Sequence, residues 1–136
     1  MTINASSDSM PQDSQGLDVL VVDDEESVLS VVEQLTAALG HRARVAESGE
    51  AALELLEAAL SDVVISDIRM PGMDGFELAQ RIRTIYPDMQ IILMTGYSLD
   101  QTSQMAAELD VTAFLHKPFK ARDLNEALSL IPKRVG

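Results

Sequence analysis

Hydrophobic residues along this chain alternate between short continuous runs and longer stretches with helical spacing. The apolar runs, each bounded by polar or turn residues, predict strands at residues 17–22, 42–46, 62–66, 90–94 and 111–115. The second of these is the weakest, because arginines interrupt it. Strands that are apolar throughout are typical of a parallel sheet buried on both faces.

Between these runs, apolar residues recur every three or four positions, which predicts helices that cover the sheet. The inward-facing positions include Val31 in the first helix and Ile85 in the third. Ser48 and Asp74 stand where helix N-caps are expected. A strand followed by a helix, five times over, predicts an α/β domain: a (βα)5 doubly wound, five-stranded parallel sheet with helices on both faces.

The domain boundaries follow from changes in composition. Residues 1–16 are polar, rich in serine and without periodicity, so we expect a disordered tail there. Residues 17–131 contain all the predicted elements and suit one domain with one core. Residues 132–136 are expected to be a C-terminal tail or the start of a linker.

Composition excludes several classes of function. Ten Lys and Arg face 22 Asp and Glu, for a net charge of −12, which disfavours direct nucleic acid binding because phosphates would be repelled. With no cysteine and two histidines, a disulfide or a structural zinc site is not expected. The chain has neither a long apolar span nor a secretory signal, so we expect no membrane insertion and a cytoplasmic location.

Polar side chains follow four of the five predicted strands. Asp23 and Asp24 come after the first strand, Asp67 after the third, Thr95 after the fourth and Lys117 after the fifth. In open parallel sheets the carboxyl ends of the strands form one edge, where ligands bind. Each residue alone has an ordinary explanation, such as a helix cap or a turn. Their shared position at one edge predicts a site.

The chemistry of this set favours a metal together with an anion. Three close carboxylates repel one another unless a cation lies between them. Oxygen ligands with open positions suit Mg²⁺, which also accepts phosphate oxygens. Lys117 and Thr95 are suited to hold an anion beside the metal. Asp67 is then a candidate nucleophile for aspartyl-phosphate chemistry, with Mg²⁺ and Lys117 neutralising the phosphoryl oxygens.

The same residues carry a family resemblance. The segments VVDDE (21–25), SDIRMPGMDG (66–75), MTG (94–96) and KPF (117–119) resemble the signatures of bacterial response-regulator receiver domains. The resemblance covers about Leu17 to Ile131. The sequences of these motifs are most similar to those of receivers of the nitrogen-regulator type. It implies a flavodoxin-like fold with strand order 2-1-3-4-5.

The resemblance also implies roles for the site residues. Asp67 is the expected phosphoacceptor, receiving a phosphoryl group from a phosphohistidine on a sensor histidine kinase or a histidine phosphotransfer protein. Asp24, Asp67 and the backbone carbonyl of Arg69 are the expected Mg²⁺ ligands, and Asp23 is expected to act through a metal-bound water. Lys117 is expected to pair with Asp67 and later with the phosphoryl group.

A conformational switch is implied as well. Thr95 is expected to move to a phosphoryl oxygen, and Phe114 to turn inward behind it. The surface of roughly residues 98–131 is the expected contact for a downstream protein or a homodimer. A cis bond between Lys117 and Pro118 belongs to the same pattern. Such a domain is not an enzyme in the usual sense, since it catalyses only its own phosphorylation and dephosphorylation.

This chain departs from the family pattern at two places beside these motifs. Asp110 stands before the fifth strand, where many relatives have glycine, so a different turn is expected there. Tyr97 borders the site and is expected either to shield the acyl phosphate from water or to be an exposed loop aromatic. The charge of Arg69 is a second candidate for tuning the rate at which the phosphoryl group is lost.

Other functions remain open at this point. A Mg²⁺-dependent phosphohydrolase would also use an Asp nucleophile, but those of the haloacid-dehalogenase type need Asp-x-Asp after the first strand. A flavodoxin-like mononucleotide binder would need a Ser/Thr/Gly-rich loop where this chain has DDEES. A degenerate receiver that binds partners without phosphorylation is the third alternative.

Overall fold

A computed structural model of the chain describes residues 16–96, 104 and 108–133. The strands are β1 (Asp18–Val22), β2 (Arg42–Ala46), β3 (Val63–Asp67), β4 (Gln90–Thr95) and β5 (Ala113–His116). The helices are α2 (Glu26–Ala38), α3 (Gly49–Ala58), α4 (Gly75–Ile85) and α6 (Ala121–Leu128). All strand pairs are parallel, in the order β2-β1-β3-β4-β5, which confirms the predicted flavodoxin-like topology.

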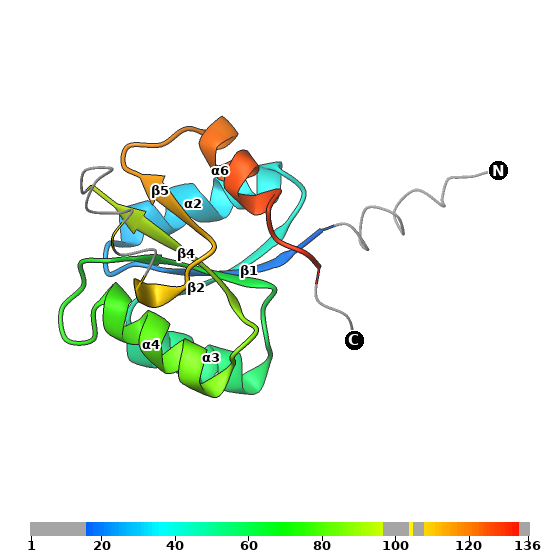
Figure 1. The fold of residues 1–136 in the computed structure, drawn as a ribbon. Coiled ribbons are helices and arrows are strands. Elements are labelled where there is room, and N and C mark those ends of the chain that lie inside the picture. Colours follow the sequence, from blue (N-terminus) through cyan, green and yellow to red (C-terminus); the bar gives the residue numbers. More distant parts are fainter. Residues whose placement is uncertain (1–15, 97–103, 105–107, 134–136) are drawn as a thin grey trace.

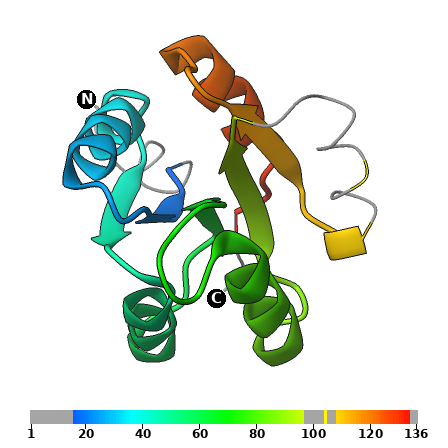
Figure 2. The ribbon, with the colours of Figure 1, turned by 90° about the vertical axis from the view of Figure 1, so that its left-hand side faces the viewer.

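The sheet lies between two layers of helices, with α2 and α6 on one face and α3 and α4 on the other (Figures 1 and 2). Alternate residues of the inner strands supply the two apolar cores. Val19, Val21 and Ile65 point to the α2/α6 side, and Leu20 and Val64 to the α3/α4 side. The inner strands are therefore buried on both faces, as their continuous apolar sequences predict.

Local signals set the ends of the helices. The Ser48 hydroxyl accepts a hydrogen bond from the Ala51 amide at 3.1 Å, and an Asp74 carboxylate oxygen accepts one from the Glu77 amide at 2.9 Å. Gly40 follows α2 with φ +94°, a left-handed conformation that glycine adopts without strain. The predicted caps are therefore confirmed.

Two predicted inward positions are wrong. Val31 and Ile85 are each 56% exposed. In α2 the buried stripe instead follows Leu29, Val32 and Thr36. Thr36 is tolerated in the core because its hydroxyl donates to the Val32 carbonyl at 2.7 Å.

The turn before β5 keeps a left-handed backbone despite its side chain. Asp110 has φ +54°, and its carbonyl accepts a hydrogen bond from Arg83 Nη2 at 3.0 Å. Arg83 Nη1 also donates to the carbonyls of Pro87 and Met89, at 2.6 and 2.8 Å. The guanidinium therefore holds the turn against the end of α4 and the start of β4.

Several predictions fall wholly or partly outside the described residues. The expected tail lies there apart from Gly16, as do residues 134–136 and Tyr97. Within the expected helix at 98–109, the described residues Gln104, Glu108 and Leu109 are helical. No helix among the residues that the structure describes has the length and apolar character needed to cross a membrane.

Candidate phosphoryl-acceptor site

The sheet brings the predicted site residues to one edge. Asp67 is the last residue of β3 and Thr95 the last of β4, while Asp23 and Lys117 directly follow β1 and β5. The register places Asp67 opposite Met94, and Thr95 opposite His116. Because all strands are parallel, their carboxyl ends meet here.

Three carboxylates gather at this edge. Oxygen atoms of Asp23, Asp24 and Asp67 all lie within 4.8 Å of one another. The side chain of Asp23 is fully buried, Asp67 is mostly buried and Asp24 is exposed. Hard oxygen ligands with one side open to solvent fit a Mg²⁺ ion that keeps some of its water. The chain's own residues therefore fit the expected metal.

Lys117 bridges two of these carboxylates. Its Nζ lies 2.8 Å from Asp67 Oδ1 and 3.4 Å from Asp23 Oδ2. Partial burial by itself lowers the pKa of Lys117, but the bonds to Asp67 and Asp23 outweigh it and raise the pKa above its ordinary value. The ammonium is therefore fully charged at neutral pH. The sequence indicated the contact with Asp67; the contact with Asp23 was not foreseen.

The ionised form of the Asp23 carboxyl is destabilised in the folded chain. Burial raises the pKa of its carboxyl, and the charge of Asp67 raises it further. The Glu25 amide, which donates to Asp23 Oδ1 at 2.9 Å, and the nearby Lys117 only partly offset this. The folded chain therefore holds a carboxylate that a bound cation would stabilise.

An open cleft of about 490 Å³ lies over the carboxylates. It is lined by Asp24, Glu25, Asp67, Ile68, Arg69, Met94, Thr95, Gly96 and Lys117. Glu25, Ile68, Met94 and Gly96 are additions to the predicted set, and their positions next to the motif residues are the only signal for them in the sequence. The cleft gives a small anion access to Asp67.

Of the two expected switch residues, one lines the cleft and the other lies on β5. Thr95 is 2% exposed and lines the cleft wall. Phe114 lies on β5 opposite Leu93, half-buried, and packs against the core on the α3/α4 side. The Lys117–Pro118 peptide bond is cis, as expected. The structure thus brings together Asp23, Asp24, Asp67, Arg69, Thr95 and Lys117, whereas Phe114 is not among the residues that line the cleft.

The loop after Asp67 returns closely to the strand. The Gly75 amide donates to the Ile68 carbonyl at 2.8 Å. A Cβ atom at Gly75 would collide with the Asp67 carbonyl oxygen and would lie 2.7 Å from the Ile68 Cα. This close approach seats the start of α4 directly behind the candidate nucleophile. The sequence suggested a helix start there, but not that only glycine fits.

Fold and site together define a class: a doubly wound domain with three clustered carboxylates and a lysine at the carboxyl edge of its parallel sheet. A model of the family described as response regulator receiver domain matches residues 19–129. The chain belongs to the family of response regulator receiver domains of two-component signalling systems. As a receiver it is not an enzyme acting on separate substrates.

Individual relatives agree with this assignment. The DNA-binding transcriptional regulator NtrC of Escherichia coli (strain K12) is 37% identical over 118 residues, which are 87% of this chain and 24% of that protein. The sensor histidine kinase RcsC of the same strain is 32% identical over 130 residues, 96% of this chain and 14% of that protein. A solved structure of the Vibrio cholerae chemotaxis protein CheY4 has a TM-score of 0.80 at 30% identity, covering 86% of this chain and 99% of that chain. The predicted likeness to nitrogen regulators is confirmed.

We expect Asp23→Asn to stabilise the metal-free protein at pH 7 by about 1 kcal/mol, or roughly 4 °C in Tm. The raised pKa of Asp23 means that the folded chain binds a proton more readily than the unfolded chain, whose value is about 3.8. Stability from this group is therefore present below pH 3.8 and is lost as pH rises through the folded pKa.

Thermal melts of both proteins over a pH series check this prediction. The Tm difference should shrink towards zero as the pH falls to about 3.8. Saturating Mg²⁺ should raise the Tm of the unmodified protein more than that of the variant, because the ion binds the folded carboxylates. A variant that is less stable at every pH would contradict the argument.

Proposed function

We propose that this chain is a phosphoacceptor receiver, in which Asp67 takes a phosphoryl group from a phosphohistidine in a Mg²⁺-dependent reaction. The observation that carries the proposal is Lys117, which bridges Asp67 and Asp23 inside a cluster of three carboxylates under an open cleft. Mg²⁺, when bound, would supply charge neutralisation for the phosphoryl oxygens. Asp24, Asp67 and the carbonyl of Arg69 would hold it, and Asp23 would act through a water.

The chemistry is a direct transfer between two nucleophiles. A carboxylate oxygen of Asp67 forms a bond to phosphorus while the bond from phosphorus to the donor's imidazole nitrogen breaks. The imidazole keeps the bonding electron pair and regains a proton from solvent. Lys117 stabilises the charge that develops on the phosphoryl oxygens, and its raised pKa keeps it protonated throughout.

The same charges support a switch. A phosphoryl group on Asp67 would offer Lys117 and Thr95 new anionic oxygens. Thr95 would move towards them and Phe114 would turn inward, which would change the surface formed by residues 98–131. We propose this surface as the contact for a downstream protein or a second copy. Arg69 and Tyr97 are proposed to set how long the phosphoryl group lasts.

A test of the function uses acetyl phosphate with Mg²⁺ and intact-mass measurement. We expect one phosphoryl adduct per chain that is labile in base and is not formed when EDTA removes the metal. Turnover of a small phosphate ester would favour the phosphohydrolase alternative. No adduct from acetyl phosphate or from phosphorylated histidine kinases would favour a receiver that acts without phosphorylation.

The phosphohistidine donor also needs a surface beside the cleft. An apolar groove is lined by Val28, Val31, Val32, Leu35 and Phe119, and it reaches Lys117. Among these residues Val31 is an exposed apolar side chain that takes no part in the core. We propose the groove as the contact for the donor protein, a kinase or a phosphotransfer protein in the cytoplasm.

We therefore expect Val31→Glu to slow transfer from a histidine phosphodonor about tenfold, because a charge there opposes apolar contact. Phosphorylation by acetyl phosphate should not change, since that donor needs only the cleft. Ile85→Glu is the matched control, because Ile85 is also 56% exposed but lies at the far end of α4. Equal slowing in the two variants would contradict a donor site on α2.

A further inference from the structure

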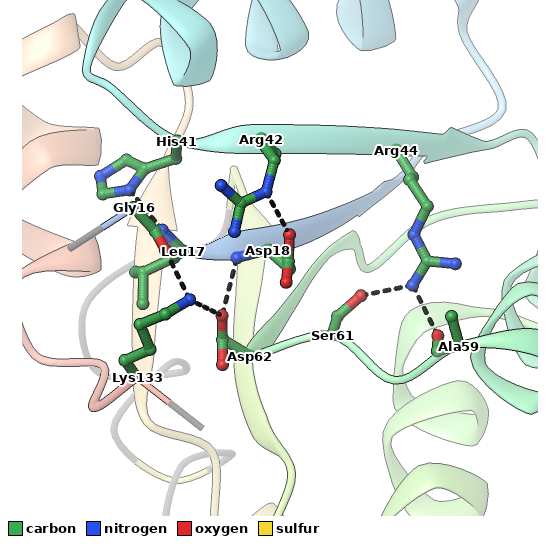
Figure 3. A network of polar contacts seen from close by, with 10 residues as sticks. All are labelled: Gly16, Leu17, Asp18, His41, Arg42, Arg44, Ala59, Ser61, Asp62 and Lys133. Atoms are coloured by element: carbon green, nitrogen blue, oxygen red, sulfur yellow. Dashed lines mark hydrogen bonds and ion pairs between the residues drawn. The ribbon is translucent and has the colours of Figure 1, made fainter. Parts of the chain in front are cut away.

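The opposite edge of the sheet contains another lysine paired with another buried aspartate (Figure 3). The Asp62 side chain is 2% exposed, and its Oδ2 accepts a hydrogen bond from the Asp18 amide at 2.7 Å. Lys133 Nζ lies 3.9 Å from the same oxygen and donates to the Gly16 carbonyl at 2.8 Å. One lysine thus joins the segment before β3 to the segment before β1.

Hydrogen bonds with the backbone of Asp18 fix the position of Asp62. The Asp62 amide donates in return to the Asp18 carbonyl at 2.8 Å, so the residue is fixed to the start of β1 in both directions. A carboxylate this buried is costly without a hydrogen-bond donor and a cation nearby. Lys133 provides a cation from a segment 71 positions further along the chain.

Residues 131–133, which we call the C-terminal strap, have an apolar anchor as well. Ile131 is 7% exposed and packs in the same core as Leu17 and Leu128. The Ile131 amide donates to the Leu128 carbonyl at 3.0 Å, so the strap follows directly from the end of α6. The strap is therefore fixed by one apolar and one charged side chain, two residues apart.

The two edges of the sheet show a matching arrangement. Asp62 directly precedes strand β3 and Asp67 ends it, while Lys117 lies four residues before helix α6 and Lys133 five residues after it. Lys117 pairs with Asp67 at the cleft, and Lys133 with Asp62 at the opposite edge. The segments that lead into and out of helix α6 are thus each joined to an end of the central strand by a charge pair.

The two lysines differ in whether another group can take the place of their carboxylate partner. Lys117 faces the open cleft, where an anion bound at Asp67 would offer it new oxygens. Lys133 also donates to the Gly16 carbonyl, which is not among the residues that line the cleft. We propose that Lys133 and Asp62 form a permanent anchor for the C-terminal end of α6. When Lys117 changes partner, the helix then shifts about this end while the strap keeps its place.

The anchor itself is independent of phosphorylation, whereas the change of partner at Lys117 rests on the proposed function. The experiment therefore needs no phosphodonor. Amide hydrogen exchange, resolved by residue with NMR, is compared for the unmodified protein and Lys133→Met, which keeps the apolar stem but removes the charge. The amides of Ile131 and Asp18 report the anchor, and amides within β3 report global opening.

In Lys133→Met we expect exchange at Ile131 and Asp18 to become about tenfold faster, with the β3 amides changed less. Lys133→Arg should restore slow exchange in part, because it keeps a charged donor. Arg122→Met, at an exposed cation on the same helix, is the control and should change neither amide. Unchanged exchange at both reporter amides in Lys133→Met would overturn the anchor.

The shift about a fixed end is tested with Lys117→Met, which releases the other end without phosphorylation. The Leu124 amide, which donates to the Lys120 carbonyl at 3.1 Å, reports the first turn of α6. In Lys117→Met we expect faster exchange at the Leu124 amide but not at the Ile131 amide. In the double variant Lys117→Met/Lys133→Met we expect faster exchange at both amides. Equal acceleration at both amides in Lys117→Met alone would overturn the proposal, whatever the acetyl phosphate test shows.

Discussion

Asp67→Asn is expected to reduce the acetyl phosphate adduct from one phosphoryl group per chain to none. The substitution keeps the size of the side chain but replaces a carboxylate nucleophile with an amide, which does not form the acyl phosphate. Asp23 and Asp24 remain in this variant, so the measurement would detect a phosphoryl group if either of them were the acceptor instead. Intact mass after incubation with acetyl phosphate and Mg²⁺ gives the result directly.

The controls separate the loss of the nucleophile from the loss of the fold. Asp88→Asn removes an exposed carboxylate outside the cleft and should leave the adduct unchanged. Asp67→Asn should still unfold in a single cooperative transition, since the core residues under the site are untouched. A phosphoryl adduct on the folded Asn variant would show that another residue is the acceptor.

Gly75→Ala is expected to destabilise the protein by about 3 kcal/mol and to lower the yield of adduct. The added Cβ would meet backbone atoms of Asp67 and Ile68, which lie under 3 Å away and cannot rotate aside as a side chain would. Either α4 or the end of β3 must move. Urea unfolding measures the loss of stability, and intact mass measures the phosphorylation of the same sample.

Gly72→Ala is the matched control in the same loop. Gly72 has φ +73° and nothing within 4 Å of an added Cβ, so the cost is backbone strain alone, about 1 kcal/mol. The comparison separates steric contact from conformational strain. If the two variants were equally destabilised, close contact between α4 and β3 would not be the reason that Gly75 is required.

The fold and most of the site followed from the sequence for a simple physical reason. The strands of a doubly wound sheet are buried on both faces, so they appear as continuous apolar runs, and their predicted positions agree with the structure to within two residues. Parallel strands share one carboxyl edge. The order of Asp23, Asp67, Thr95 and Lys117 along the chain was therefore enough to place them together.

Other features depend on three-dimensional packing that local patterns do not contain. Val31 points outward because of how α2 is rotated on the sheet. Several valines at helical spacing do not determine that rotation. The second contact of Lys117, with Asp23, depends on the path of a side chain between two strands. Asp62 looked like an ordinary strand start, because its partner Lys133 lies far along the chain and outside every motif.

The place where the described chain enters and leaves the domain has a consequence for how such domains are combined. Gly16 and Lys133 are in direct contact at the edge of the sheet away from the cleft (Figure 3). Sequence fused before or after this unit therefore starts beside the same small area and need not cover the cleft. We therefore expect that the domain can be inserted into a host loop, or permuted by joining the chain near Gly16 and Lys133 and opening it elsewhere, with the carboxylate cleft still facing solvent.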